Sequence, residues 1–405
     1  MPKKRLKILF LAHLLPLPLD SGGKIKSYYT LKALAAGHDV RMLAYVRSDE
    51  EMDCLDKLRS VCDEIEIVPL KRGKLQQVCD LARAMVTGKS FIVNRDYRRD
   101  MQDAFNRIVA EFQPDVVHID HLQMAQFVDF SGRYRKVLDN HNVESMIIKR
   151  IADTSEMAPA RMYAGLEWPK LRAYEIDVCR RADRVLTVSD EDKSTLDTLC
   201  SGTANTACVP IGVDVHYFEH VDRTQGSKNI LSIGTMYWPP NVDSMLYFCR
   251  EILPLVKAEI PGCTVTIAGQ RPVESIRALA SDPSVRVTGY VSDSRRESKD
   301  CGVFVVPLRS GSGVRVKILN ALAMGLPVVS TSIGAEGLAV ESGKHLMIAD
   351  TPEDFARAVV NVLGSPELAD KIGRSGRALI CELYSWEKVG ERLLSVYDEL
   401  AGGGS

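Results

Sequence analysis

Short apolar segments alternate with longer segments of helical periodicity along the first half of the chain. The apolar segments predict strands at residues 6–12, 39–46, 64–69, 115–119, 135–139, 184–188 and 207–210. Between them, apolar residues recur at helical spacing, most clearly at 24–36, 98–112 and 160–182. Strands that are apolar throughout and separated by helices are typical of parallel sheets built from βαβ units.

The same pattern restarts after a polar, irregular stretch at residues 212–229, which we expect to hold a linker. The second series of strands is predicted at 229–234, 263–269, 285–288, 302–306 and 327–331. A last amphipathic helix is predicted at 386–400, with an apolar stripe formed by Val389, Leu393, Val396 and Leu400. We therefore expect two α/β domains, at 1–212 and 213–385, followed by this helix and a flexible tail at 401–405.

Composition agrees with two ordinary domains, since 405 residues suffice for each domain to bury its own core. The formal net charge is −1, with 45% hydrophobic and 26% charged residues, so nothing indicates nucleic acid as a partner. The ten cysteines are scattered and contain no CxxC pair. Reduced thiols in a cytoplasmic protein are therefore expected.

The N-terminus has a basic start followed by an apolar stretch, which superficially resembles a secretory signal. The apolar stretch is interrupted by His13, Pro16 and Pro18, and LKILFLA is a natural first strand. No apolar run is long enough to predict a transmembrane helix. Four cations begin the chain, at Lys3, Lys4, Arg5 and Lys7. We expect them to be solvated, with at most a peripheral contact with the inner face of the membrane.

Residues 311–331, GSGVRVKILNALAMGLPVVST, hold the densest cluster of candidate chemistry. Gly311 and Gly313 allow backbone N–H groups to approach an anion, and a helix beginning near Val314 would aim its positive end at the same place. Arg315 and Lys317 add two full charges. The sequence therefore predicts a site for a phosphate-bearing ligand, in which these cations stabilise negative charge.

Further candidates follow predicted strands, at the edge where open α/β sheets bind ligands. Asp120 and His121 follow the strand DVVHI, and His118 inside that strand is expected to be a hydrogen-bonded core residue. His141 follows the next strand, either as a ligand-binding residue or as a cap of the helix beginning at Val143.

Two further candidate binding segments contain glycine and lie next to a predicted strand or helix. Glu336, in GAEGL, follows the strand LPVVST. Gly22 and Gly23 precede the helix at 24–36, either to bring backbone N–H groups to a ligand or to form a tight turn. The first βα turn has no GxGxxG, so dinucleotide binding of the dehydrogenase type is not expected there.

No metal site is predicted. Asp190, Glu191 and Asp192 form a DxD pattern, but they begin a helix, where N-capping and the helix dipole explain acidic residues. Cysteine and histidine spacings do not suit zinc, and no GxSxG elbow indicates a hydrolase.

Six motifs occur in order along the chain, and together with GxRxKILNAxAxGxPVVST they resemble retaining glycosyltransferases of the family-four type, often found with bacterial exopolysaccharide genes. The motifs are SGG at 21–23, DVVHIDHLQMA at 115–125, LDNHNVES at 138–145, IGTMYWPPNVDSM at 233–245, GAEGL at 334–338 and YSWEKV at 384–389. The resemblance implies the GT-B fold, with two Rossmann-like domains, a cleft between them and a C-terminal helix crossing back to the first domain. It also implies transfer of a sugar, with retention, from a nucleotide-diphosphate sugar to a saccharide or lipid-linked saccharide acceptor, without a cofactor.

Family roles carry over to the residues that match its motifs. Catalytic roles fall on Asp120, His121, Arg315 and Lys317. Donor-binding roles fall on Gly22, Gly23, His141, Gly234, Gly311, Ser312, Gly313, Val314, Asn320 and Glu336. The family's usual spacing for the histidine near the reacting sugar leads to Asp120, one residue before His121, so both are candidates.

One departure concerns two glutamates, seven residues apart in the family, whose positions are occupied here by Ser312 and Asn320. The second glutamate accepts hydrogen bonds from the donor ribose. An amide carbonyl also accepts such bonds, but without charge each should be roughly half as strong. Asn320 therefore leaves open a non-catalytic nucleotide- or glycan-binding member. A sugar-nucleotide 2-epimerase, another enzyme class with the same fold, is the other alternative.

Overall fold

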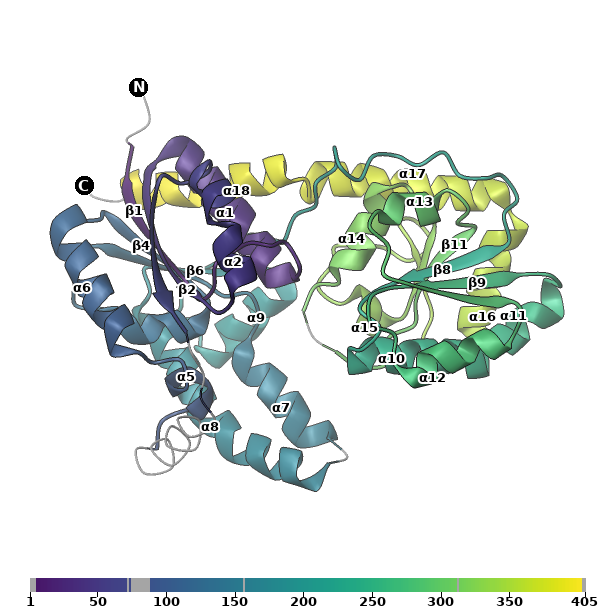
Figure 1. The fold of residues 1–405 in the computed structure, drawn as a ribbon, viewed down its shortest axis with the longest axis horizontal. Coiled ribbons are helices and arrows are strands. Elements are labelled where there is room, and N and C mark those ends of the chain that lie inside the picture. The colour runs from purple at the N-terminus through teal and green to yellow at the C-terminus, as the bar shows by residue number, and fades with distance from the viewer. Residues whose placement is uncertain (1–4, 71–72, 74–87, 156, 312, 403–405) are drawn as a thin grey trace. The chain divides into compact units, whose positions relative to one another are not determined.

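The computed structural model describes residues 5–70, 73, 88–155, 157–311 and 313–402 (Figure 1). The chain divides into two compact units. Unit 1 contains the chain up to Pro210 and again from Gly390 onwards, and unit 2 contains Ile211–Val389. Lys3, Lys4 and residues 403–405 of the expected tail lie outside the described residues, as does Ser312.

Unit 1 is built on a seven-stranded sheet whose strands pair in parallel, in the order β3-β2-β1-β4-β5-β6-β7. Its strands are β1 (Lys7–Ala12), β2 (Asp39–Val46), β3 (Glu64–Pro69), β4 (Val116–Asp120), β5 (Arg135–Asp139), β6 (Arg184–Thr187) and β7 (Thr206–Cys208). The order reverses between β1 and β4, which makes their carboxyl ends the natural ligand site of this sheet. The register sets Ala12 opposite Asp120, and Asp120 opposite Asp139.

Helices of unit 1 cover this sheet and keep its strands buried. They are α1 (Gly22–Gly37), α2 (Asp49–Asp53), α3 (Leu55–Arg59), α5 (Phe91–Asn94), α6 (Arg99–Phe112), the 3₁₀ helix η1 (Leu122–Phe127), α7 (Glu144–Thr154), α8 (Ala158–Arg181) and α9 (Asp190–Leu199). The observed α1 begins earlier than expected, so Gly22 and Gly23 form its first turn. No helix in the described part of the chain is both long and apolar enough to cross a bilayer.

The last helix, α18 (Trp386–Gly402), contributes its residues from Gly390 onwards to unit 1. Leu393 and Val396 of the predicted stripe are buried, together with Tyr397, which the sequence did not single out. The Tyr397 hydroxyl lies 2.7 Å from His118 Nδ1 on β4. The helix continues through Gly402, so the expected tail does not begin at 401, because Ala401 favours helix.

Unit 2 is built on a six-stranded parallel sheet in the order β10-β9-β8-β11-β12-β13. Its strands are β8 (Asn229–Ile233), β9 (Thr264–Ala268), β10 (Val285–Gly289), β11 (Val303–Val306), β12 (Val328–Ser330) and β13 (Met347–Ile348). The strand β13 was not predicted, because two residues are too short to show a period. Here the order reverses between β8 and β11.

Helices of unit 2 include the one predicted after the glycine-rich loop, α14. They are α10 (Pro239–Tyr247), the π-helical turn η2 (Phe248–Ile252), α11 (Leu253–Glu259), α12 (Glu274–Arg277), the 3₁₀ turn η3 (Ala278–Ser281), α13 (Ser294–Ser298), α14 (Val316–Ala323), α15 (Ser332–Ala335), α16 (Pro352–Gly364) and α17 (Pro366–Leu383). The helix α14 begins at Val316 rather than near Val314, with Arg315 as its N-cap residue. Gly325, with φ of 73°, follows its C-cap residue Met324.

Candidate functional site

A histidine–carboxylate cluster lies at the carboxyl edge of the unit 1 sheet. Asp120 ends β4 and is 1% exposed. Its two carboxylate oxygens lie 3.0 Å from His141 Nε2 and 3.1 Å from His121 Nδ1. The Ser27 hydroxyl, on α1, donates to the same carboxylate at 2.9 Å. The structure thus brings together three residues that the sequence predicted separately, Asp120, His121 and His141.

The carboxylate of Asp120 and the imidazole of His141 shift each other's pKa. Burial alone would raise the pKa of Asp120, but the charges and hydrogen bonds of His121 and His141 outweigh it and hold that pKa well below its usual range. Burial and Lys26 lower the pKa of His141, whereas Asp120 and Asp139 raise it more, so the net pKa is raised. Each group thus favours the charged form of the other across the 3.0 Å contact between His141 Nε2 and Asp120 Oδ1.

His121 combines this contact with an unusual backbone conformation. Its φ of 77° is rare for a residue other than glycine. Such conformations cost about 1–3 kcal/mol and cluster at functional sites. The backbone N–H of His121 donates to the Asp139 carbonyl at 3.1 Å, and the rings of His121 and His141 have centroids 3.9 Å apart.

Gly22 and Gly23 place the first turn of α1 next to both histidines. A Cβ atom on Gly23 would lie 3.4 Å from His121 Nε2 and 3.7 Å from His141 Nδ1. Neither glycine has a positive φ, so the tight-turn explanation is not supported. Because Gly23 has no side chain, the space next to the rings of His121 and His141 stays open.

A second layer behind Asp120 was missed by sequence reasoning. Lys26 Nζ, 1% exposed, bonds to the carboxylate of Asp139 on β5. The other Asp139 oxygen lies 3.8 Å from His141 Nε2 and 3.7 Å from His118 Nε2. Burial lowers the pKa of His118 to about 4, so this core histidine is neutral, in line with its predicted structural role. The sequence signal that could have indicated this layer is Lys26, which lies three residues after Gly23 on the same helix.

His141 is not a helix cap. The first amides of α7 are bound instead by Glu175 of α8, which accepts from Glu144 N at 2.9 Å and from Ser145 N at 3.1 Å. Glu175 also accepts from Asn140 Nδ2 at 3.2 Å. The capping alternative for His141 is therefore wrong, because the Glu175 carboxylate of the neighbouring helix α8 already binds these amides.

A third histidine, also missed, lies at the carboxyl end of β1. His13 Nε2 is 3.1 Å from the fully buried carboxylate of Asp96, and its ring centroid is 5.7 Å from that of His121. Burial, opposed by Asp96, lowers the pKa of His13. Because β1 and β4 flank the point where the strand order reverses, His13 belongs to the same candidate site.

Two groups in the described part of the chain have the donor atoms for a metal ion within 4.8 Å of one another. They are Asp120, His121 and His141, and His118, Asp120 and Asp139. The DxD segment behaves as a helix start: Ser189 Oγ accepts from Asp192 N at 3.0 Å and caps α9. Lys26 bonds to Asp139, which places a cation beside the second group.

In unit 2, the predicted anion site lies at the N-terminus of α14. Gly311 and Gly313 have φ of 137° and 74°, a backbone path that favours glycine. The Arg315 guanidinium bonds to the Gly313 carbonyl and lies 3.7 Å from Glu336 Oε2. Glu336 thus orients a predicted cation, and the loop is held against it.

Lys317 lies on the first turn of α14 and is half-buried, next to Asn241 of α10 and Gly234, which directly follows β8. Its Nζ donates to Asn241 Oδ1 at 2.8 Å. A Cβ atom on Gly234 would lie 3.5 Å from that Nζ, so Gly234 borders the same space. Burial, and then the charge of Arg315, lower the pKa of Lys317 to about 7. Asn241 lies inside the motif at 233–245 but was not predicted as a site residue.

Asn320 lies one turn further along α14, half-buried. Among the described residues, none forms a hydrogen bond with its side-chain amide. Val314 is half-buried in the loop before the helix. The predicted donor-binding residues of unit 2 therefore lie around the start of α14, whereas Gly22, Gly23 and His141 lie in unit 1.

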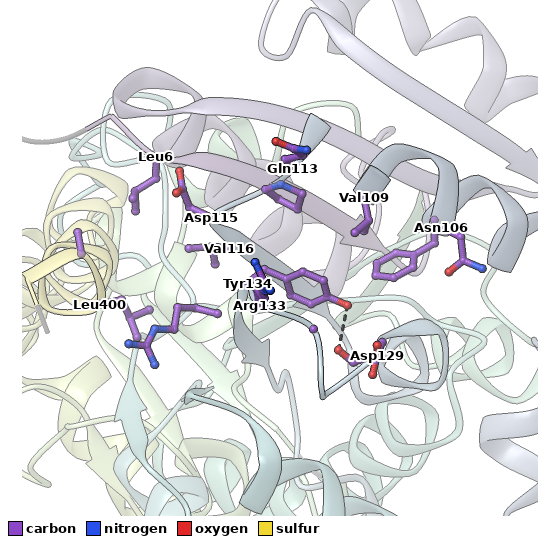
Figure 2. A pocket seen from close by; sticks show the side chains of 15 residues that line it. Leu6, Asn106, Val109, Gln113, Asp115, Val116, Asp129, Arg133, Tyr134 and Leu400 are labelled. Atoms are coloured by element: carbon purple, nitrogen blue, oxygen red, sulfur yellow. Dashed lines mark hydrogen bonds between the residues drawn. The ribbon is translucent and has the colours of Figure 1, made fainter. Parts of the chain in front are cut away.

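A separate cavity of about 720 Å³ lies in unit 1, away from these residues (Figure 2). Its lining includes Leu6 and Asp115, which directly precede β1 and β4, and Arg135, which begins β5. Figure 2 also shows the Tyr134 hydroxyl bonded to the Asp129 carbonyl, at 2.9 Å. The cavity thus lies at the amino end of the strands and contains none of the predicted site residues.

Comparison with known proteins gives one family and several relatives. Residues 227–365 match the family described as Glycosyl transferases group 1, a range that contains Gly234, Arg315 and Lys317. A protein of Klebsiella pneumoniae, described as an uncharacterized 44.6 kDa protein in the cps region, is 22% identical over 398 residues, 95% of this chain and 97% of its own length. Phosphatidyl-myo-inositol mannosyltransferase of Mycobacterium tuberculosis is 26% identical over 211 residues, 49% of this chain and 55% of that enzyme.

Solved structures share the architecture. The Anabaena protein Alr3699/HepE, in complex with UDP, matches with a TM-score of 0.69 at 12% identity, over 97% of this chain and 100% of that one. The structural neighbours are proteins of the GT-B type. The expected fold class, two parallel-sheet α/β domains of the GT-B type, is therefore confirmed.

Proposed function

Starting from the group 1 glycosyltransferase family that these matches support, we propose that the chain transfers a sugar from a nucleotide-diphosphate sugar to a hydroxyl acceptor with retention of configuration. The observation that carries this proposal is the pair of cations at the start of α14, within the matched range. Sugar transfer from such a donor releases a diphosphate, and its developing negative charge is what those cations would stabilise.

Lys317 is the strongest element of the donor site. A buried ammonium whose pKa is lowered to about 7 is poorly stabilised by the protein alone. A diphosphate beside it would supply the missing negative charge, and the N–H groups of α14 would add to the attraction. Arg315 provides a second, always charged donor for the same ligand.

Residues of unit 1 would handle the sugar and the acceptor. Asp120 is ionised and held by Ser27, His121 and His141, so the rings have fixed orientations. Fixed polar groups of this kind position a reacting hydroxyl efficiently. We assign Asp120 and His121 the catalytic role, and His141, Gly22 and Gly23 the role of bordering the bound sugar. Retention by front-face attack needs no covalent nucleophile, and none is assigned.

We further propose that no metal or other cofactor takes part. Arg315, Lys317 and the start of α14 would do for the diphosphate what a divalent cation does elsewhere. Turnover should survive exhaustive treatment with EDTA. If EDTA abolishes turnover and added Mg²⁺, Mn²⁺ or Zn²⁺ restores it, this part of the proposal is wrong. The metal would then be expected at the cluster around Asp120.

The biological setting proposed is polysaccharide or glycoconjugate biosynthesis, with a saccharide or lipid-linked saccharide as acceptor. It is supported by the relative from a cps region and by the mannosyltransferase, whose name describes a lipid substrate. We propose a cytoplasmic protein with at most a peripheral membrane contact, and no nucleic acid as partner.

The test begins with a thermal-shift panel of nucleoside diphosphates and nucleotide sugars, because a ligand that binds the native state raises its apparent stability. The selected donor is then incubated with candidate acceptors, and the release of nucleoside diphosphate and the anomeric configuration of the product are measured. An inverted product would overturn retention.

Two outcomes favour the alternatives. Conversion of the donor alone into an epimer indicates the 2-epimerase. Donor binding without release of nucleoside diphosphate, with every acceptor tried, indicates a non-catalytic member, which Asn320 makes the alternative of interest.

A further inference from the structure

The outer face of α8 carries an apolar stripe that faces solvent. Met162 and Leu166 are 69% and 62% exposed, and exposed prolines, Pro159 and Pro169, extend the stripe at helical spacing. The opposite face of the same helix is buried, including Leu171. The exposed stripe is therefore not part of the core of unit 1.

The apolar surface continues around the turn between α7 and α8. Met157 is 69% exposed, and Ile151 and Met146 on α7 are 40% and 37% exposed. Residues 146–166 hold six of the fifteen large hydrophobic side chains that are exposed among the described residues. Such a concentration marks an interaction surface, since single exposed apolar residues are ordinarily scattered. Figure 1 shows α7 and α8 as a hairpin that extends from the sheet of unit 1.

Cations flank this surface. Arg150 and Arg161 are exposed, and Lys149 and Lys170 are half-buried beside it. On the acidic side, Asp153 is bonded to Lys149 at 2.6 Å. Glu167 lies on the buried face, where it accepts from Ile92 N at 3.0 Å. The described exposed charges around the stripe are therefore mainly positive.

We propose that the α7–α8 hairpin, residues 144–170, binds the surface of an anionic lipid bilayer. A helix with an apolar stripe flanked by cations can lie flat in a bilayer interface, with its apolar side chains among the acyl chains. The flanking cations match the negative potential of anionic headgroups. The unbranched, flexible side chains of Met157 and Met162 adapt to lipid without a shaped partner.

The hairpin is joined rigidly to the candidate site. The helix α7 starts three residues after His141, and Glu175 of α8 holds both its first amides and Asn140. With 11 residues, α7 spans about 16 Å. A bilayer bound to the hairpin would therefore lie near Asp120 and His141. That this favours a lipid-linked acceptor rests on the proposed function, whereas the bilayer contact does not.

The test measures flotation of the full chain with vesicles of phosphatidylcholine, with and without phosphatidylglycerol. Met162→Gln/Leu166→Gln removes the centre of the stripe, and Met52→Gln, 41% exposed elsewhere on unit 1, is the matched control. We expect the wild type and the control to bind the anionic vesicles, and the double variant to bind at least tenfold more weakly. Arg150→Gln/Arg161→Gln should abolish the preference for phosphatidylglycerol.

The opposite results are equally clear. A wild type that does not float with anionic vesicles, or a folded double variant that floats like the control, overturns the proposal. Self-association of the wild type in sedimentation velocity that the double variant loses, without vesicle binding, would assign the stripe to a second protein copy instead. Circular dichroism verifies the fold of each variant. Because flotation needs no nucleotide, its outcome is independent of whether sugar transfer is observed.

Discussion

Asp120 is the residue on which the candidate site of unit 1 converges. Its carboxylate is almost fully buried, yet it stays ionised because His121, His141 and Ser27 all face it. A buried charge with several fixed partners holds the side chains around it in one geometry, and such charges are common at functional sites. Lys317 plays the corresponding part in unit 2, where burial weakens its own charge.

Asp120→Asn and His121→Ala should lower kcat more than they lower donor affinity. These side chains lie in unit 1, whereas the cations that would hold the diphosphate lie in unit 2, so they should act mainly on the transition state. Turnover and donor affinity are measured in parallel, with Met52→Gln as a control on the same unit. Near-normal turnover in both variants would move the catalytic assignment towards His141 or His13.

Donor affinity should decrease as the pH rises above about 7. The lowered pKa of Lys317 means that the free site is partly neutral near this pH, and a bound diphosphate raises that pKa, so binding takes up a proton. Below the pKa of the free site the lysine is already charged, and affinity should be insensitive to it. Calorimetry in two buffers of different ionisation enthalpy measures the uptake, and Lys317→Met should abolish it. Proton release on binding would contradict the assignment.

Secondary elements explain what could be foreseen from the sequence. Asp120, His121 and His141 were predictable because each directly follows a strand whose apolar run can be read locally. Lys26, Asp139 and Asp96 were not, because their partners depend on which strands are neighbours. Asp139 faces Asp120 only through the β4–β5 register, and His13 reaches His121 only because β1 lies beside β4.

The helix α14 gives the most direct test of the donor site. Arg315→Ala/Lys317→Ala should weaken nucleoside diphosphate binding at least tenfold, since charged hydrogen bonds contribute about 1.5–3 kcal/mol each. Arg357→Ala, which removes an exposed arginine of α16, is the control for net charge. Equal affinity of the double variant and the control in calorimetry would exclude this helix start as the diphosphate site.

Asn320→Glu tests the second turn of the same helix. If the ribose binds there, a carboxylate should accept its hydroxyls about twice as strongly as the amide does, and donor affinity or turnover should rise. Asn320→Ala, which lacks any acceptor, should lower donor affinity. Equal or lower activity of a folded Asn320→Glu variant would mean that the ribose is bound elsewhere.

At the scale of the whole molecule, unit 1 is assembled from two distant parts of the chain. Residues from Gly390 onwards pack on the first 210, and Tyr397 reaches His118 inside the sheet. Burial raises the pKa of Tyr397 well above its usual range, so the hydroxyl stays protonated. The helix α18 is thus part of the core of unit 1.

Tyr397→Phe should destabilise the protein by about 1–3 kcal/mol, because it leaves a buried nitrogen of His118 without its partner. Urea unfolding measures the change, and Tyr290→Phe, at a position 74% exposed, is the control. Equal midpoints of unfolding for the two variants would show that the bond between Tyr397 and His118 contributes nothing.

The place of α18 in unit 1 has a consequence for how the polypeptide matures on the ribosome. Translation delivers all of Ile211–Val389 before it delivers Tyr397. The unit whose synthesis begins first is therefore completed second, and until then its sheet lacks the helix that covers His118. During that interval the nascent chain exposes apolar surface that the finished protein buries, the condition in which a chain is most prone to aggregate.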